Sequence, residues 1–343
     1  MLGLSGLERL RSWQLNAVPP PPLHHLTGAM PKRFGDGTAE AEMPASGWLA
    51  NSAGLLGGGT LAMVADIAFG CSVETQLPPA TPYTTAELSL TFLRPARPGG
   101  RLTAAGQAIH TGRSVGLSEA FLIEEESERL IGHGTSRLSI LPAIDPAPEP
   151  PRNWPEAAPP EHDTPDPYLR TVPETVLGKE VWEQLAGAEI LARQIRGELP
   201  PPPIHFLTGI APTEAGEGTV TVVMPASEWL ASPTRLLQGG TLVMLADTAM
   251  LLAVMTISPA GTAYVGLDLK VNFLRPAPPD GRDLMARAEV VHAGRTIAIT
   301  SARIENADGK VVALATGSSM FLRGHGWPPT DVELASGGPS PRA

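Results

Sequence analysis

Two aspartates stand inside stretches of the chain that are otherwise almost wholly apolar. Asp66 lies in LAMVADIAFG and Asp247 in LVMLADTAML, each roughly two helical turns after a glycine-rich turn, at 57–59 and 238–240 respectively. Free backbone amides at the start of a helix, together with the helix dipole, stabilise a carbonyl oxygen that gains negative charge. A carboxylate is costly to bury, so two equivalent ones require a reason. The pattern favours a site for carbonyl chemistry, and an aspartate hydrogen-bonded within the core is the alternative.

Four other signals carry less weight. Residues 112–116 match the G-x-S-x-G elbow of serine hydrolases, but a strand pattern follows where that elbow needs a helix. His24 and His205 have no cluster of metal-binding residues around them, which favours packing or hydrogen bonding. Cys71 lies in an apolar helix pattern and is interpreted as a core residue. Four arginines could contact phosphates, and ordinary ion pairing explains them equally well: Arg94, Arg113, Arg275 and Arg295.

The composition excludes several classes of partner. The chain has 343 residues, with 25 Lys and Arg against 35 Asp and Glu, a net charge of −10. It therefore lacks the basic surface that binds nucleic acid or an anionic membrane. A single cysteine excludes an internal disulfide framework and favours a reducing, cytoplasmic location, and we expect no metal or redox cofactor. The apolar run 241–258 could span a bilayer by length, but the central Asp247 favours a buried core helix.

The chain consists of one unit used twice. PPPPLHHLTG at residue 19 returns as PPPPIHFLTG at residue 200, and MPASGWLA at 43 returns as MPASEWLA at 224. LLGGGTLAMVADIA at 55 and LSLTFLRPA at 88 also return, with the same offset of 181 residues. A constant offset over this length indicates a duplicated domain.

Proline and acidic residues separate the two copies. Such a segment buries too little apolar surface to offset its ordering entropy, so we interpret it as an extended linker. Helix-like runs at 4–15 and 185–196 precede the two PPPP segments. The predicted organisation is a first domain at 1–142, a linker at 143–173, a second domain at 174–325 and a disordered tail at 326–343.

The elements within a unit follow from hydrophobic periodicity. A strand at 37–43 precedes a helix from 58 to about 73 that is apolar on nearly all faces. Alternation at 88–92 predicts a strand, and three more follow at 101–110, 115–124 and 130–141, with counterparts 181 or 182 residues later. The fold class is α+β, with a curled antiparallel sheet wrapped around one helix in each unit.

These motifs resemble a known family. The pattern N-x-x-G-x-x-G-G-G, then L-A-x-x-A-D-x-A, then T-A-E-L-S-L-T-F-L-R-P-A is similar to the hotdog-fold acyl-CoA thioesterases of the phenylacetyl-CoA thioesterase-like group. The resemblance covers about 250 residues in both units and implies a double hotdog. It also implies that each site is shared, with the glycine turn of one unit polarising the thioester and the acid of the other activating water or attacking.

The family's motif implies two centres. In what we call the Asp66 centre, Asp66 and Thr85 face Gln238 and Gly239 of the second unit. Gln238 stands where the family usually has a histidine. The backbone N–H of Gly239, helped by Gln238, is expected to hold the oxyanion, with Asp66 as general base on a water held by Thr85.

The second centre, called the Asp247 centre, is poorer in side chains. Asp247 is expected to face Asn51 and Gly58, while Gly57 replaces the histidine and Gly266 stands where the hydroxyl residue would be. On these groups the sequence ranks the Asp66 centre as the stronger.

The leading hypothesis is an acyl-CoA thioesterase, with coenzyme A only as part of the substrate and a homodimer of double hotdogs as the expected assembly. A non-catalytic acyl-CoA-binding protein or regulator is the alternative. A hydratase of the same fold needs a histidine beside the acid, which neither helix contains. The acyl preference depends on a tunnel lined by adaptable residues and is not predicted: Met63, Phe69, Met244 and Met250.

Overall fold

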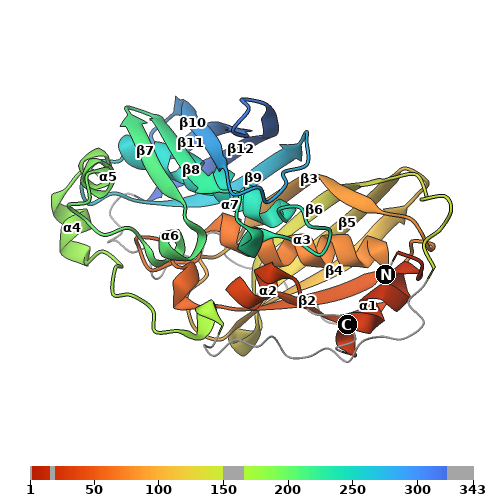
Figure 1. The fold of residues 1–343 in the computed structure, drawn as a ribbon. Helices are drawn as coiled ribbons and strands as arrows, with labels where there is room; N and C mark the ends of the chain where they lie inside the picture. Colours follow the sequence, from red (N-terminus) through yellow and green to blue (C-terminus); the bar gives the residue numbers. More distant parts are fainter. Residues whose placement is uncertain (1, 16–19, 150–165, 323–343) are drawn as a thin grey trace.

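The computed structural model describes residues 2–15, 20–149 and 166–322, and in them each repeat forms one long helix and six strands (Figure 1). The elements of the first unit are α1 (Gly6–Gln14), α2 (Pro22–Thr27), β1 (Met30–Gly35), β2 (Thr38–Pro44), η1 (Gly47–Leu49), α3 (Gly58–Glu74), β3 (Tyr83–Phe92), β4 (Arg101–Thr111), β5 (Val115–Glu124), η2 (Glu125–Ser127) and β6 (Arg129–Ile140). The elements of the second are α4 (Lys179–Gln184), α5 (Gly187–Ile195), α6 (Pro203–Thr208), β7 (Ala211–Gly216), β8 (Thr219–Pro225), η4 (Glu228–Leu230), α7 (Gly239–Thr256), β9 (Ala263–Phe273), β10 (Asp283–Ala293), β11 (Ile297–Glu305) and β12 (Val311–Leu322).

All twelve strands form one sheet in the order β1-β2-β4-β5-β6-β3-β9-β12-β11-β10-β8-β7, with every neighbouring pair antiparallel. The two units meet where β3 pairs with β9. Ser89 lies opposite Lys270 there, and these two residues are repeat equivalents. A local two-fold axis therefore passes through this pair, and each half of the sheet is the rotated copy of the other.

The central helices α3 and α7 are buried on all sides, because the curled sheet covers one side and the other helix and flanking segments cover the rest (Figure 1). This arrangement explains why neither helix shows an amphipathic pattern. In the described part of the chain, α7 is the one helix long and apolar enough to cross a membrane. Of its residues, 78% are buried inside the protein, as expected for a core helix.

Glycine allows the two helices to approach each other closely. A Cβ on Gly59 would lie 2.4 Å from the Cα of Met244, and a Cβ on Gly240 would lie 2.6 Å from the Cα of Met63. Real Cβ atoms do not approach backbone this closely, so only glycine fits at these two positions. The N-terminal end of each helix is thereby held against the middle of the other.

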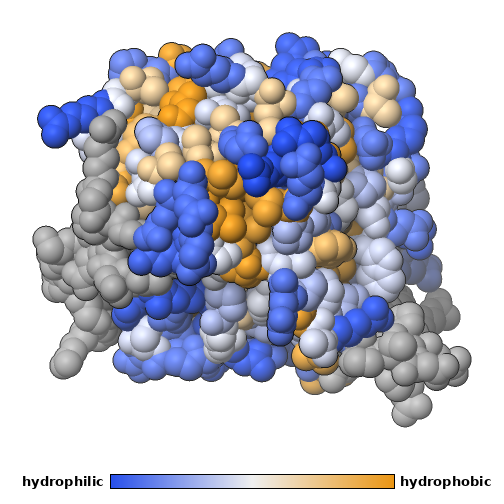
Figure 2. All heavy atoms as spheres, turned by 90° about the vertical axis from the view of Figure 1, so that its left-hand side faces the viewer, coloured by the Kyte–Doolittle hydropathy of each residue, from blue (hydrophilic) through white to orange (hydrophobic). Residues whose placement is uncertain are grey.

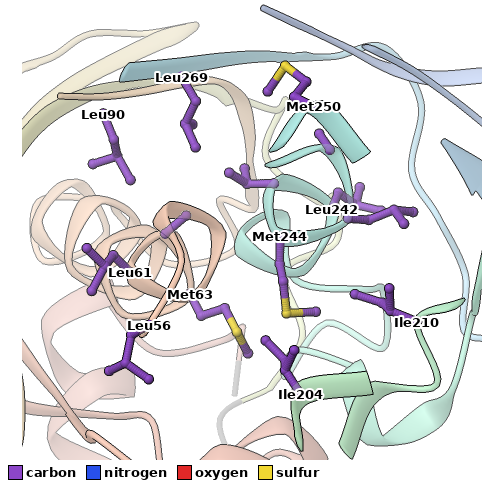
Figure 3. Close-up of a cluster of buried hydrophobic side chains, with 14 of the residues drawn as sticks. Leu56, Leu61, Met63, Leu90, Ile204, Ile210, Leu242, Met244, Met250 and Leu269 are labelled. Atoms are coloured by element: carbon purple, nitrogen blue, oxygen red, sulfur yellow. The ribbon is translucent and has the colours of Figure 1, made fainter. Parts of the chain in front are cut away.

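One hydrophobic core extends through both units. Met63 on α3 and Met244 on α7 lie side by side and point toward Ile204, while Leu90 and Leu269 reach the helices from the sheet (Figure 3). All five side chains are buried and belong to the same cluster. The units therefore share their apolar interior.

The structure confirms the α+β double hotdog and both central helices. It also contains two edge strands that the hydrophobic pattern did not predict, β1 and β7. β1 carries Pro31 and two exposed basic side chains, and β7 is exposed along nearly its whole length. Edge strands of this kind lack the alternation on which sequence prediction depends.

The final part of the predicted linker lies against the first unit. Trp48 Nε1 donates to the carbonyl of Arg170 at 2.9 Å, and Ser46 Oγ donates to the carbonyl of Tyr168 at 3.1 Å. Residues 150–165 of that linker and the tail at 326–343 lie outside the described residues. The proposed domain limits stay predictions.

Candidate functional site

The Asp66 centre brings together side chains from both units. Asp66 lies on α3, opposite the start of α7, where its Oδ2 accepts the backbone N–H of Gly240 at 3.1 Å. Its Oδ1 accepts the hydroxyl of Thr85, on β3, at 3.0 Å. Burial raises the pKa of Asp66 above its ordinary value, and these bonds, with a further one from the amide of Gly239, oppose the rise. The sequence-based grouping of Asp66, Thr85 and Gly239 therefore describes a real cluster.

Gln238 occupies the N-cap of α7 in this centre. Its side chain is 7% exposed, and Nε2 donates to the carbonyl of Met63 at 2.9 Å. Its Oε1 is buried and has no hydrogen-bond partner among the described residues. The Gln238 side chain thus bonds across to α3 and fills space beside Asp66.

The Asp247 centre is built by the same geometry with fewer groups. Asp247 Oδ2 accepts the backbone N–H of Gly59 at 2.7 Å. Gly266 occupies the position of Thr85, so this carboxylate has no hydroxyl donor from β9. Burial raises the pKa of Asp247 to about 6, and the Gly59 amide alone opposes the rise.

A cavity of about 140 Å³ opens at the Asp247 centre. It lies between the units, with walls from the start of α3, from α7, from the start of β9 and from the α4–α6 segment. Its lining includes Asn51, Leu55, Gly57, Gly58, Gly59, Phe92, Arg94, Trp182, Gln194, Ile204, His205, Met244, Asp247, Thr248, Leu251, Leu252, Met255, Tyr264 and Gly266. Asp247 is therefore accessible from a mostly apolar chamber.

Asn51 and Gly58 both lie in this cavity wall, as the sequence-based grouping expects. Asn51 Oδ1 accepts the amides of Ala53 and Leu55, so this carbonyl holds its own turn together. A Cβ on Gly58 would lie 2.3 Å from Phe92 Cζ, which explains the glycine. The amide that binds the Asp247 carboxylate belongs to Gly59, one residue beyond Gly58.

Two cavity residues were not among the sequence-based candidates for catalysis. His205 on α6 is 9% exposed, and burial lowers its pKa to about 4, so its imidazole is neutral at pH 7. Trp182 lies on α4, and the offset of 181 places its repeat counterpart at Met1, outside the described residues. A repeat comparison therefore gives no signal for Trp182, whereas His205 recurs as His24 and was assigned to packing.

The serine-hydrolase-like motif and Cys71 lie in ordinary structural positions. Residues 112–114 connect β4 to β5, so a strand and not a helix follows Ser114. Cys71 is buried, and burial raises the pKa of its thiol. Within residues 2–15, 20–149 and 166–322, no three His, Cys, Asp or Glu side chains gather to hold a metal ion.

Comparison with known proteins relates this geometry to a family. A family model described as "Thioesterase superfamily" matches residues 53–130 and again residues 236–313, once in each unit. The acyl-coenzyme A thioesterase PaaI of Escherichia coli strain K12 is 33% identical over 116 residues, which cover 34% of this chain and 80% of PaaI. This chain belongs to the thioesterase superfamily.

Solved structures show that this superfamily member has the double-hotdog architecture. The tesB protein of Mycobacterium avium subsp. paratuberculosis matches with a TM-score of 0.56 at 13% identity, over 88% of this chain and 98% of its own. The acyl-CoA thioesterase II TesB2 of Mycobacterium marinum matches with a TM-score of 0.52 at 14% identity, over 89% and 98% of the two chains. At such identities the likeness concerns the fold.

Proposed function

We propose that this thioesterase-superfamily chain hydrolyses acyl-CoA thioesters to a carboxylic acid and coenzyme A. The observation that carries the proposal is the position of each buried carboxylate: Asp66 and Asp247 lie against the first amides of the opposite unit's central helix. Such amides stabilise the oxyanion of acyl transfer. The acyl-CoA substrate is taken from the name of the relative PaaI.

The proposed reaction needs only groups of this chain and water. An aspartate carboxylate accepts a proton from water as the water oxygen bonds to the thioester carbonyl carbon. The carbonyl oxygen gains the negative charge and binds a helix-terminal amide. When the oxyanion collapses, the C–S bond breaks and the proton passes to the sulfur of coenzyme A. In an alternative route, the carboxylate itself attacks the carbonyl carbon and the C–S bond breaks, which leaves a mixed anhydride and a thiolate that takes a proton from water. A water molecule then hydrolyses the anhydride and restores the carboxylate.

The amide that holds the oxyanion must be free of the aspartate. At the Asp247 centre, the carboxylate takes the Gly59 amide, and the amide of Gly58 has no acceptor among the described residues. At the Asp66 centre, the Gly240 amide bonds to the carboxylate, and the Gly239 amide also helps to lower the pKa of Asp66. A thioester carbonyl therefore finds a free amide more readily at Gly58.

The test measures release of free thiol from acyl-CoAs of several chain lengths. General-base assistance contributes about 10²–10⁴-fold, so the double variant D66N/D247N is expected to lose activity by this factor. The exposed Asp36 provides a matched control, since D36N makes the same chemical change away from both centres. A double variant that remains folded and keeps the wild-type rate contradicts the proposal.

A binding protein without turnover is the second candidate. The observation that favours it is the Gln238 amide, which stands where the family usually has a histidine and already spends one of its two N–H donors on the Met63 carbonyl. Calorimetric titration with acyl-CoAs, combined with the thiol assay, separates the two functions. Binding of several acyl-CoAs with release of none supports the second candidate and excludes the first.

A further inference from the structure

The two units place a helix at the same point beside the end of each central helix. A Cβ on Gly6 of α1 would lie 1.6 Å from the carbonyl oxygen of Glu74, and a Cβ on Gly187 of α5 would lie 2.0 Å from that of Met255. Glycine makes the same close contact in both units. Side chains at equivalent positions of α1 and α5 can therefore be compared directly.

In the first unit this position holds a buried polar network. Arg9 is 4% exposed, and its Nε donates to Glu74 Oε1 at 2.8 Å. Tyr83 donates its hydroxyl to the other Glu74 oxygen at 2.9 Å, and Arg9 Nη1 donates to the carbonyl of Leu4 at 2.9 Å. An acyl chain entering here would separate a buried ion pair and leave a charge unpaired.

In the second unit the equivalents of Arg9 and Glu74 are Ile190 and Met255, both buried and apolar. Met255 lines the cavity at the Asp247 centre, together with Leu251, Leu252 and Trp182. The side of the molecule that carries α4, α5 and α6 shows a band of apolar residues between hydrophilic ones (Figure 2). This end of the second unit thus offers apolar space where the first unit has charge.

The two centres also differ at the glycine turn before each central helix, where the first centre is again the more filled one. Gln238 reaches across to the Met63 carbonyl and fills the space beside Asp66. Its repeat equivalent is Gly57, which has no side chain, and both Gly57 and Met244 line the cavity. The space that a glutamine occupies at the Asp66 centre is therefore part of the cavity at the Asp247 centre.

Resting on the proposed hydrolysis, we infer that the chain has a single substrate site, at the Asp247 centre. An apolar acyl group lies in the cavity along α7, against Leu251, Leu252 and Met255, with its thioester carbonyl at the Gly58 amide. The Asp66 centre is closed by the Arg9–Glu74–Tyr83 network and by Gln238, and its carboxylate holds the two central helices together. This assignment reverses the ranking that the sequence suggests.

Binding stoichiometry tests the inference independently of turnover. The D66N/D247N chain, which is expected to be hydrolytically inactive, is titrated with decanoyl-CoA in a calorimeter. One molecule bound per chain is expected, and two molecules per chain overturn the inference. The assay of single variants gives a second readout: D247N is expected to lose more than 100-fold in kcat and D66N less than tenfold, and the reverse order also overturns it.

A pair of variants tests where the acyl group lies. Leu251→Trp fills the cavity, so KM for decanoyl-CoA is expected to rise at least tenfold more than KM for acetyl-CoA. Glu74→Gln changes the first unit's network by one isosteric group and is expected to leave the ratio of the two KM values unchanged. A ratio that changes in E74Q and not in L251W contradicts the inference. If the wild type hydrolyses neither compound, the proposed function fails. The single site is then still tested by the binding stoichiometry and by the effect of L251W on the affinity for decanoyl-CoA.

Discussion

The two aspartates show how the same residue type acquires different properties from its hydrogen-bond donors. Asp66 has Thr85 and two amides to stabilise its ionised form, while Asp247 has the Gly59 amide alone. Both are buried to a similar extent, at 7% and 6% exposed. The two carboxylates therefore differ in their donors, and the pKa of Asp247, raised to about 6, lies near that of an efficient general base at neutral pH.

The pH dependence of hydrolysis follows from this pKa. Asp247 must be ionised to accept a proton, so kcat/KM is expected to rise with pH through about 6 and to level off above pH 7. The other ionisable side chains of the cavity are Arg94 and, kept neutral across this range by burial, His205 and Tyr264. Initial rates at subsaturating substrate between pH 5 and pH 8 measure the profile. A profile that is flat over this range contradicts the assignment of Asp247.

A hydroxyl placed beside Asp247 should move that profile. A Cβ on Gly266 would meet only Leu251 and Phe92, at 3.8 and 3.9 Å, so a side chain fits. In Gly266→Thr the new hydroxyl is expected to donate to Asp247, as Thr85 does to Asp66, and to lower the pKa of Asp247. The rise in kcat/KM should then occur at lower pH than in the wild type. Gly266→Ala is the control, with the added carbon and no donor, and an equal shift in both variants would exclude the hydroxyl as the cause.

The same pKa has a consequence for stability. Because the pKa of Asp247 is raised on folding, the folded chain binds more protons than the unfolded chain between about pH 4 and pH 6. The free energy of unfolding therefore falls as pH rises through this window, by about 3 kcal/mol in total. Asp247→Asn removes this cost, so the variant is expected to be more stable than the wild type at pH 8 and nearly equal to it at pH 4. Urea unfolding at the two pH values measures the difference, with D36N as a control that shows none.

Sequence reasoning grouped residues that lie together in the structure, and it gave no information on the cavity beside them. Asp66 and Thr85 were grouped from their repeat positions, and the structure joins them at 3.0 Å. The cavity beside Asp247 is lined by Gly57, which has no side chain, and by Trp182, whose repeat position is Met1, outside the described residues. The number of polar side chains favours the Asp66 centre. The sequence does not show that these side chains also occupy the space that a substrate would need there.

Among the helices and strands, those that bury an apolar face could be predicted from the sequence, and those that are exposed could not. The helices α3 and α7 and most inner strands were predicted within a few residues, because their apolar residues face one shared core, whereas only the second halves of β3 and β9 were predicted. The edge strand β7 was not, because it is almost entirely exposed and pairs only with β8. Its partner β8, with the pattern GTVTVVM, is covered on one face and was recognised.

The crossing of α3 and α7 depends on glycine. Gly59→Ala is expected to lower the free energy of unfolding by about 1–3 kcal/mol, because the new Cβ would lie 2.4 Å from the Met244 backbone and the helices must move apart. Its neighbour Gly57 is the matched control. A Cβ on Gly57 would make an ordinary contact of 3.4 Å with Asp247, and its φ of −70° suits alanine. Thermal unfolding is expected to show a lower Tm for G59A and no loss for G57A; equal Tm values would contradict the close crossing.

At the scale of the whole molecule, the two units form one folding unit. The sheet is continuous across β3 and β9, the central helices pack on each other, and one apolar cluster contains residues of both halves. Because the halves share a sheet and a core, unfolding of one half would remove packing from the other, and we expect one cooperative transition. The expected pairing of two such chains into a dimer stays a prediction, and light scattering of the purified chain measures it.

The two halves of the chain are therefore expected to unfold together, in one shared transition. Leu90 of the first unit and Leu269 of the second lie opposite each other across the β3–β9 seam and are fully buried, so each replacement by alanine should cost about 2–5 kcal/mol. Trp13 and Trp48 of the first unit and Trp182 and Trp229 of the second allow each half to be monitored in single-tryptophan variants. Because the core is shared, L90A and L269A are expected to shift the urea midpoints of both halves equally. A shift confined to the half that carries the substitution would mean that the units unfold separately despite the common sheet.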